Sequence, residues 1–111
     1  MEFEIAPKLL IETLKRLLPH KSSLLKKGPL VTLHAEGDAL DVIGQFENTW
    51  SVHAVVHKSG RCTVDIAGLM TPLKTYDQKL PIRFVLSDDG LRFGTTKMKL
   101  HRDFSLSLGS E

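Results

Sequence analysis

Phe3-Glu4-Ile5-Ala6 and Val64-Asp65-Ile66-Ala67 are similar strand-like stretches, and each leads into a segment with helical periodicity, residues 7–18 and 68–76. The two Ile-Ala pairs lie 61 residues apart. Further along, residues 31–33 resemble residues 82–84, and the turn at 36–40 resembles the turn at 87–91, both 51 residues apart. The first copy therefore has ten extra residues after its helix. Repetition of this kind predicts a duplicated unit of a strand, a helix and further strands.

The remaining pattern predicts an α+β fold of one domain, residues 1–111, with halves at approximately 1–58 and 61–108. Pro7 suits the start of the first helix, whereas Pro72 should make the second helix short or late. Asp65 is expected to cap the second helix. About eight strands are expected, at residues 3–5, 30–35, 40–45, 50–57, 62–66, 81–86, 91–95 and 104–108, and 97–100 is a further strand or the start of the last one. The antiparallel sheets should share one core, with both helices side by side on one face.

Composition is ordinary for a globular domain, with 41% hydrophobic and 25% charged residues. Charged residues recur throughout, so no apolar run is long enough to span a membrane. Met1 is followed by a strand-like stretch and not by an apolar signal segment, so the expected location is the cytoplasm. Cys62 is the one cysteine, which excludes an internal disulfide.

Charge is distributed unevenly, although the net charge is only +2. Residues 8–27 contain six bases and one acid, a local charge of +5, and the rest of the chain has a charge of −3. A basic segment on a nearly neutral domain can bind a polyanion. The alternative is a solvated helix face followed by a polar loop.

The sequence does not indicate an active site or a metal centre. His53 and His57 share one face of a predicted strand and His34 lies on another strand, a pattern that suits sheet-surface histidines better than zinc ligands. Cys62 lies near His57, but a third group that would orient a thiol nucleophile is missing. Trp50 is expected to pack in the core or at an interface. We therefore predict a protein that is not an enzyme and needs no metal or cofactor.

Several stretches together resemble one domain of the bacterial DNA sliding clamp, the beta subunit of DNA polymerase III. The resemblance spans nearly the whole chain and lies in the order and spacing of Phe3-Glu4-Ile5, the leucine-rich helix at 9–18, and residues 30–33, 40–42, 51–56, 63–66 and 104–107. Domains of this family are also internally two-fold, in agreement with the repeat.

The resemblance implies a DNA-clamp-like function in replication and processivity. Clamp domains join edge to edge into a closed ring, with sheets outside and helices that face duplex DNA and contact its phosphates without reading sequence. By this resemblance, the predicted DNA-binding residues are Lys8, Lys15 and Arg16 on the first helix, Lys21, Lys26 and Lys27 in the following loop, and Lys74 and Lys79 on or after the second helix. Lysine and arginine suit a sliding contact because they neutralise phosphates without fixing a register.

The expected partners are duplex DNA, further copies of the chain through sheet edges, and replication or repair proteins. Clamps of the family carry three such domains, so a ring of this single domain would need about six copies. Two alternatives remain: a clamp-fold module that binds a protein partner without DNA, and a small hydrolase or metal protein that uses His53, His57 and Cys62.

Overall fold

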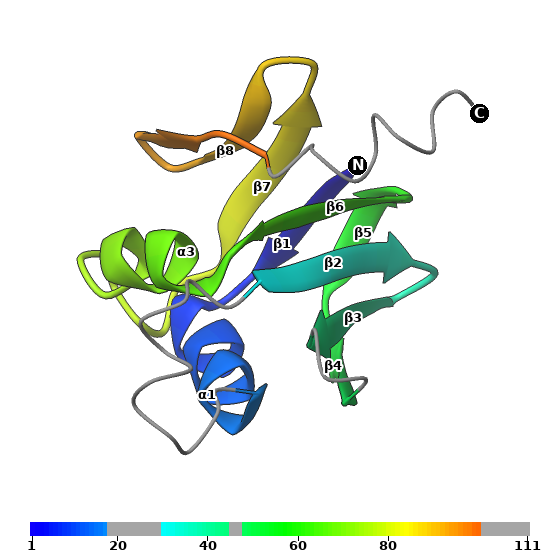
Figure 1. Cartoon of the computed structure of the whole chain (residues 1–111), viewed down its shortest axis with the longest axis horizontal. Helices are drawn as coiled ribbons and strands as arrows, with labels where there is room; N and C mark the ends of the chain where they lie inside the picture. Colours follow the sequence, from blue (N-terminus) through cyan, green and yellow to red (C-terminus); the bar gives the residue numbers. More distant parts are fainter. Residues whose placement is uncertain (18–29, 45–47, 101–111) are drawn as a thin grey trace.

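The computed structural model describes residues 1–17, 30–44 and 48–100, which form two antiparallel sheets and two helices (Figure 1). One sheet has the strand order β5-β1-β7-β8-β9, and the other has the order β4-β3-β2-β6. In chain order the elements are β1 (Glu2–Ile5), α1 (Pro7–Leu17), β2 (Leu30–Glu36), β3 (Ala39–Gly44), β4 (Thr49–His53), β5 (Val55–Lys58), β6 (Gly60–Asp65), α3 (Ile66–Leu73), β7 (Ile82–Ser87), β8 (Gly90–Phe93) and β9 (Thr96–Met98). The α+β prediction is confirmed.

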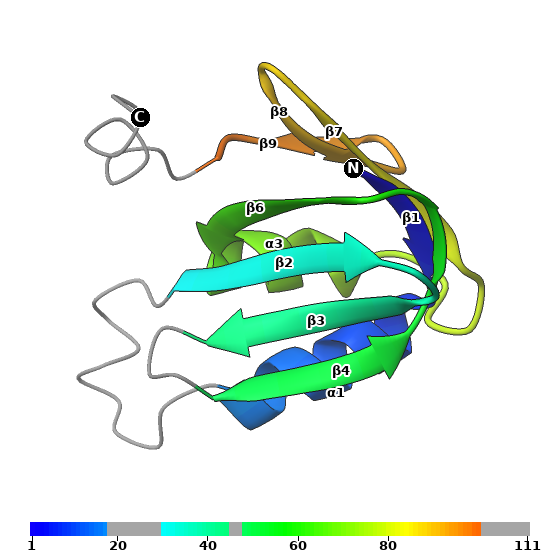
Figure 2. The ribbon, with the colours of Figure 1, turned by 90° about the vertical axis from the view of Figure 1, so that its right-hand side faces the viewer.

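The two helices lie next to each other on one side of the sheets, as expected. Figure 2 shows both of them behind the sheet that contains β2, β3 and β4. α1 contacts β3 and β4, α3 contacts β6 and β9, and the helices contact each other. Neither described helix has the length and apolar character that crossing a bilayer requires.

The first strand of each half pairs with a strand of the other half. β1 pairs with β7 of the other half, and β6 pairs with β2. Residues 3 and 5 face residues 84 and 82, and residues 62 and 64 face residues 33 and 31. Residues 33 and 84 occupy equivalent places in the two halves, at the spacing of 51. Their partners, residues 62 and 3, are therefore equivalent too, at a spacing of 59. The spacing of 61 read from the Ile-Ala pairs was wrong by two, and because the hairpin turns keep a spacing of 51, the first half has eight extra residues and not ten.

The second helix is short, as Pro72 suggested, but it begins at Ile66, earlier than the predicted residue 68. Asp65 is its N-cap, and the Asp65 carboxylate accepts a hydrogen bond of 2.8 Å from the Gly68 N–H. That bond satisfies one of the unpaired amides of the first turn. Pro72 is tolerated because the helix ends one residue later, at Leu73.

The strand predicted at residues 50–57 is two strands in different sheets. The chain passes from β4 to β5 at Ala54, which is buried and donates its backbone N–H to the Asp38 carbonyl at 3.1 Å. Val52 and Val56 are both partly buried, so the predicted alternation is present on both sides of Ala54. Periodicity could not show the break because the alternation continues through it.

Nine strands are present within the described ranges, where about eight had been expected, and β9 includes the first two residues of the segment predicted at 97–100. The strand predicted at residues 104–108 lies outside the described residues. The core between the sheets contains a stack of three aromatic rings, Phe3, Phe84 and Phe93, with neighbouring centroids 4.8 Å apart. Such offset stacks add to the hydrophobic stabilisation of a core.

Candidate nucleic-acid interface

The exposed side of α1 carries most of the predicted DNA-binding residues that the structure describes. Leu10, Leu14 and Leu17 face the core, which leaves residues 8, 9, 12, 15 and 16 exposed. Lys8 and Lys15 are seven residues apart, so they lie on the same side of the helix about 10 Å apart along its axis. Glu12 is exposed between them and offsets part of their positive charge.

Arg16 has a partner that sequence reasoning missed. Its guanidinium lies over the ring of Trp50, 4.9 Å from the ring centroid. Trp50 is 41% exposed on the edge strand β4. Of the two placements expected for it, the core and an interface, the core is therefore wrong. A stacked guanidinium is held in place by a cation–π interaction, while its edge N–H groups can still donate hydrogen bonds.

Lys79 lies near the first turn of α1, although it follows the other helix in sequence. The Lys8 backbone N–H donates to the Gln78 carbonyl at 3.1 Å, which brings Lys8 next to the segment that contains Lys79. Lys74 is the C-cap of α3 and is exposed. Asp77 is also exposed and accepts a hydrogen bond from the Lys79 backbone N–H, so this corner contains an acid as well as bases.

The exposed side of α3 is nearly neutral, because Ala67, Gly68, Thr71 and Thr75 share it with Lys74. Over the two helices, four bases therefore face solvent with one acid. Within the described ranges, the amino groups of Lys8, Lys15, Lys74 and Lys79 have no ion pair. Lys21, Lys26 and Lys27 lie outside the described residues. We name the side formed by Lys8, Lys15, Arg16, Lys74 and Lys79 the basic helical face.

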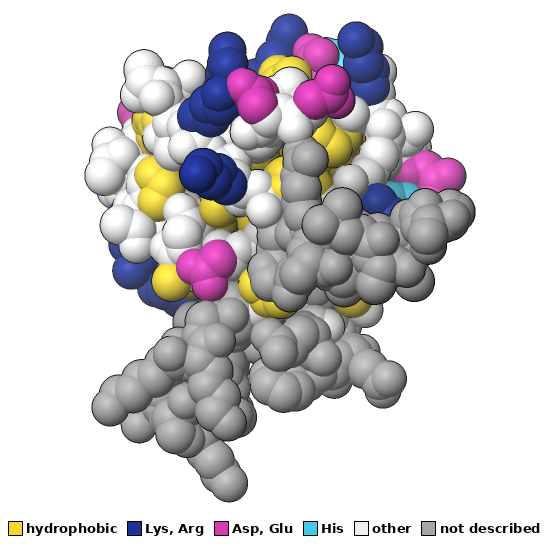
Figure 3. Space-filling view, turned by 45° about the horizontal axis from the view of Figure 1, so that its top comes forward, with side chains coloured by type: hydrophobic (Ala, Val, Ile, Leu, Met, Phe, Trp, Pro, Cys, Tyr) yellow, Lys and Arg dark blue, Asp and Glu magenta, His cyan; other side chains and the backbone are white. Residues whose placement is uncertain are grey.

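The opposite surfaces of the sheets carry mixed charge. Figure 3 shows basic and acidic side chains close together over the end of the molecule that includes the β7–β8 hairpin. Arg83 contacts Glu2 at 3.1 Å and Glu4 at 2.9 Å, and Lys97 pairs with Asp89. The opposite charges within these ion pairs compensate each other, so this surface has less positive charge available to attract a polyanion.

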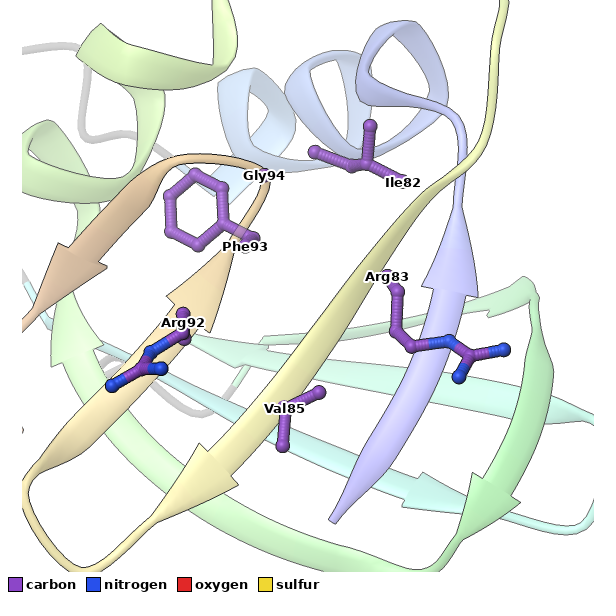
Figure 4. A pocket seen from close by; sticks show the side chains of 6 residues that line it. All are labelled: Ile82, Arg83, Val85, Arg92, Phe93 and Gly94. Carbon is purple, nitrogen blue, oxygen red and sulfur yellow. The ribbon is translucent and has the colours of Figure 1, made fainter.

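A hollow of about 340 Å³ on the outer side of β7 and β8 does not form a convergent site (Figure 4). Val85 lies between Arg83 and Arg92 among the residues that line it. The two guanidiniums point away from each other, and that of Arg83 is turned toward β1, where Glu2 and Glu4 bind it. The hollow therefore lacks the converging polar groups of a small-molecule site.

The histidines considered as metal ligands are dispersed over the sheets. His57 contacts the Glu4 carboxylate at 2.7 Å, and His34 lies 3.6 Å from a carboxylate oxygen of Asp41. No cluster of three potential metal ligands occurs in the part of the chain that the structure describes. The hydrogen bond from His57, followed by that from Arg83, lowers the pKa of Glu4. These contacts link neighbouring strands and are explained by sheet stabilisation.

Cys62 is unsuited to nucleophilic chemistry. Its side chain is buried, and burial raises the pKa of the thiol to about 12. A thiol with such a pKa stays protonated at neutral pH and is a poor nucleophile. The geometry thus weakens the hydrolase alternative.

Comparison with solved structures shows which fold this arrangement represents. Sliding clamps from Helicobacter pylori, bound to a DNA ligase peptide, and from Caulobacter crescentus match 90% of the chain with TM-scores of 0.71 and 0.68 at 14% and 17% identity. The polymerase III beta subunit of Pseudomonas aeruginosa matches the same share with a TM-score of 0.67 at 20% identity. The chain has the sliding-clamp fold. It spans about 30% of the length of these clamps.

The two comparisons made with the sequence itself found no relative. No protein-family model matches the sequence, and no curated protein matches it. At this level of identity the clamp fold is shown, whereas the activity and partners of clamps are not transferred with it.

Proposed function

We propose that this clamp-fold domain is a non-enzymatic protein that self-associates through sheet edges and contacts the backbone of duplex DNA through its basic helical face, independently of sequence. The observation that carries the proposal is the placement of Lys8, Lys15, Arg16 and Lys74 on the exposed sides of two adjacent helices. Lys79 joins them through the segment that is hydrogen bonded to the start of α1.

The chemistry of the face suits a mobile contact. Lysine amino groups without ion pairs are free to neutralise phosphates and release counterions, and they impose no register along the duplex. No base-reading element is needed for such binding. The face is too weakly charged, with four helical bases and one acid, to hold DNA tightly as a single copy, so several copies acting together would strengthen binding.

Sheet edges provide the route to self-association. β4 ends one sheet and β9 ends the other, and each has an unpaired edge among the described strands. An unpaired edge can accept a strand of another subunit. If β4 of one copy joined β9 of the next, contacts would be head-to-tail and could close into a ring of about six copies.

A charge-reversal experiment tests the DNA contact. We expect the combined variant Lys8→Glu, Lys15→Glu and Lys74→Glu to lose binding to a fluorescently labelled duplex, measured by anisotropy at low salt. A matched control, Lys58→Glu, Arg61→Glu and Arg92→Glu, makes the same change in net charge at exposed positions on the sheets and should bind far better. Wild-type affinity should fall steeply between about 50 and 200 mM salt. Equal losses in the two variants would contradict the proposal.

A second candidate function is a clamp-fold module that binds a protein partner without DNA. Two observations favour it: the Helicobacter pylori clamp was solved with a DNA ligase peptide, and large apolar side chains are exposed on this chain at Leu9, Trp50, Val55 and Leu80. Contiguous exposed apolar surface is typical of protein interaction sites. Salt-insensitive binding of a protein partner, with no duplex binding at low salt, would favour this alternative.

A further inference from the structure

A small apolar pocket lies where three strands of one sheet meet the start of α1. It is lined by residues from the end of β1, the first turns of α1, the passage from β4 to β5 and the residue before β7, namely Glu4, Ile5, Ala6, Leu9, His53, Ala54, Val55 and Pro81. Its volume is about 240 Å³. Small-molecule sites usually measure about 300 to 1,000 Å³, so this pocket suits one or two inserted side chains better than a cofactor.

Exposed apolar residues gather around this pocket. Leu9 and Val55 line it while being 39% and 53% exposed, and Leu80, 60% exposed, directly precedes the lining residue Pro81. Two of the four large hydrophobic side chains that are exposed in the described structure therefore line this pocket, and a third is the chain neighbour of a lining residue. Exposing them to water is unfavourable, and covering them would recover about 25 cal/mol for each Å² of apolar area.

The surroundings of the pocket are basic. Lys8 precedes Leu9 in α1, Lys79 lies two residues before Pro81, and both are exposed. The one acid in the lining, Glu4, is already engaged by His57 at 2.7 Å and by Arg83 at 2.9 Å, so its charge is compensated. Asp77 accepts the Lys79 amide and reduces the positive charge without reversing it.

We propose that this pocket binds a peptide segment of a partner protein, in which a bulky aliphatic or aromatic side chain is flanked by acidic residues. The apolar side chain would enter between Leu9, Val55 and Pro81, and the flanking carboxylates would meet Lys8 and Lys79. Buried apolar anchors carry most of the binding energy in such contacts, and rim charges set the specificity and the association rate. The inference goes beyond the proposed DNA contact and does not depend on it.

The test is selection from a phage-displayed library of random peptides on the whole immobilised chain. We expect enrichment of sequences with Leu, Ile, Phe, Met or Trp next to Asp or Glu. A labelled synthetic copy of an enriched peptide should bind at least about tenfold more weakly to Leu9→Asp and to Val55→Asp, since either change places a charge in the apolar pocket. Leu9→Asp should fold, because a carboxylate is favourable near a helix N-terminus.

Ser59→Asp is the matched control, because it adds the same charge at an exposed turn outside the pocket and should leave peptide binding unchanged. Three results would overturn the proposal: no enrichment above background, enriched peptides that bind both pocket variants as well as the wild type, or dissociation of a self-associated protein by Leu9→Asp with no peptide binding. The last result would assign the pocket to contacts between copies. Duplex binding measured on Val55→Asp reports separately on the basic helical face, because Val55 lies on β5 and not on a helix.

Discussion

Tyr76 offers the sharpest test of how the edge strand β9 is held, through the variant Tyr76→Phe. The Tyr76 hydroxyl lies 2.6 Å from Oγ1 of Thr96, accepts the Thr95 backbone N–H at 3.0 Å, and donates to the Phe93 carbonyl at 3.3 Å. The hydroxyl thus joins the segment after α3 to the β8–β9 turn. Gly94 in that turn has a φ of +56°, and a Cβ there would approach the tyrosine ring to 2.7 Å.

The expected cost follows from the two shortest contacts. Each hydrogen bond contributes about 0.5–1.5 kcal/mol net, and partial exposure of the ring lets water replace some of the loss, so Tyr76→Phe should lower the free energy of unfolding by about 1–2 kcal/mol. For a domain of this size, that corresponds to a fall in Tm of roughly 4–15 °C. Urea and thermal unfolding followed by circular dichroism would measure both quantities.

A local measurement separates this account from a general loss of stability. Amide exchange should accelerate most at Thr95 and along β9, because the phenylalanine ring still fills the same space while the turn loses its hydrogen bonds. Ser59→Ala, at an exposed side chain in the β5–β6 turn, should stay within about 0.5 kcal/mol of the wild type. Unchanged stability of Tyr76→Phe, or accelerated exchange spread evenly over both sheets, would refute the reasoning.

Three further predictions concern single contacts. Asp65→Ala should lower the free energy of unfolding by about 1 kcal/mol in urea titrations, because α3 loses its N-cap; an unchanged midpoint would show that the cap is dispensable. The lowered pKa of Glu4 means that its carboxylate stabilises the fold above its ordinary pKa of 4.5, and that this contribution is lost as the pH falls through the lowered value. The stability difference between the wild type and Glu4→Gln should therefore close in acid, and a constant difference would argue against the ion pairs. Arg16→Ala should change the emission of Trp50, the only tryptophan, by removing the stacked guanidinium; an identical spectrum would mean that the stack does not persist in solution.

The repeat in the sequence was sufficient to predict the class of fold and the adjacency of the helices. Apolar spacing defined α1 to within one residue, and Asp65 marked the start of α3 through a local capping bond. Both signals are local, and local signals can be read from sequence. The exact equivalence of the halves required the sheet registers, because the Ile-Ala similarity was two residues out of step with the pairing of β6 with β2.

Features that arise from tertiary packing could not be predicted. The change of sheet at Ala54 leaves the alternation of buried residues intact, so the sequence 50–57 looks like one strand. The Arg16–Trp50 stack joins residues that are far apart in sequence. The apolar pocket around Leu9 and Val55 combines three separate segments of the chain, and none of them has a distinctive motif. The residues of the basic helical face were predicted from the resemblance to clamps, with support from the local positive charge of residues 8–27, and their contact with DNA stays a proposal.

Solution mass tests most directly whether a single clamp-fold domain can work as a clamp, because one copy cannot encircle a duplex. Sedimentation equilibrium over a range of concentrations should show mass rising from the 12.4 kDa of one chain toward a closed assembly of about six copies. A single species of 12.4 kDa at every concentration, with and without duplex DNA, would contradict the account.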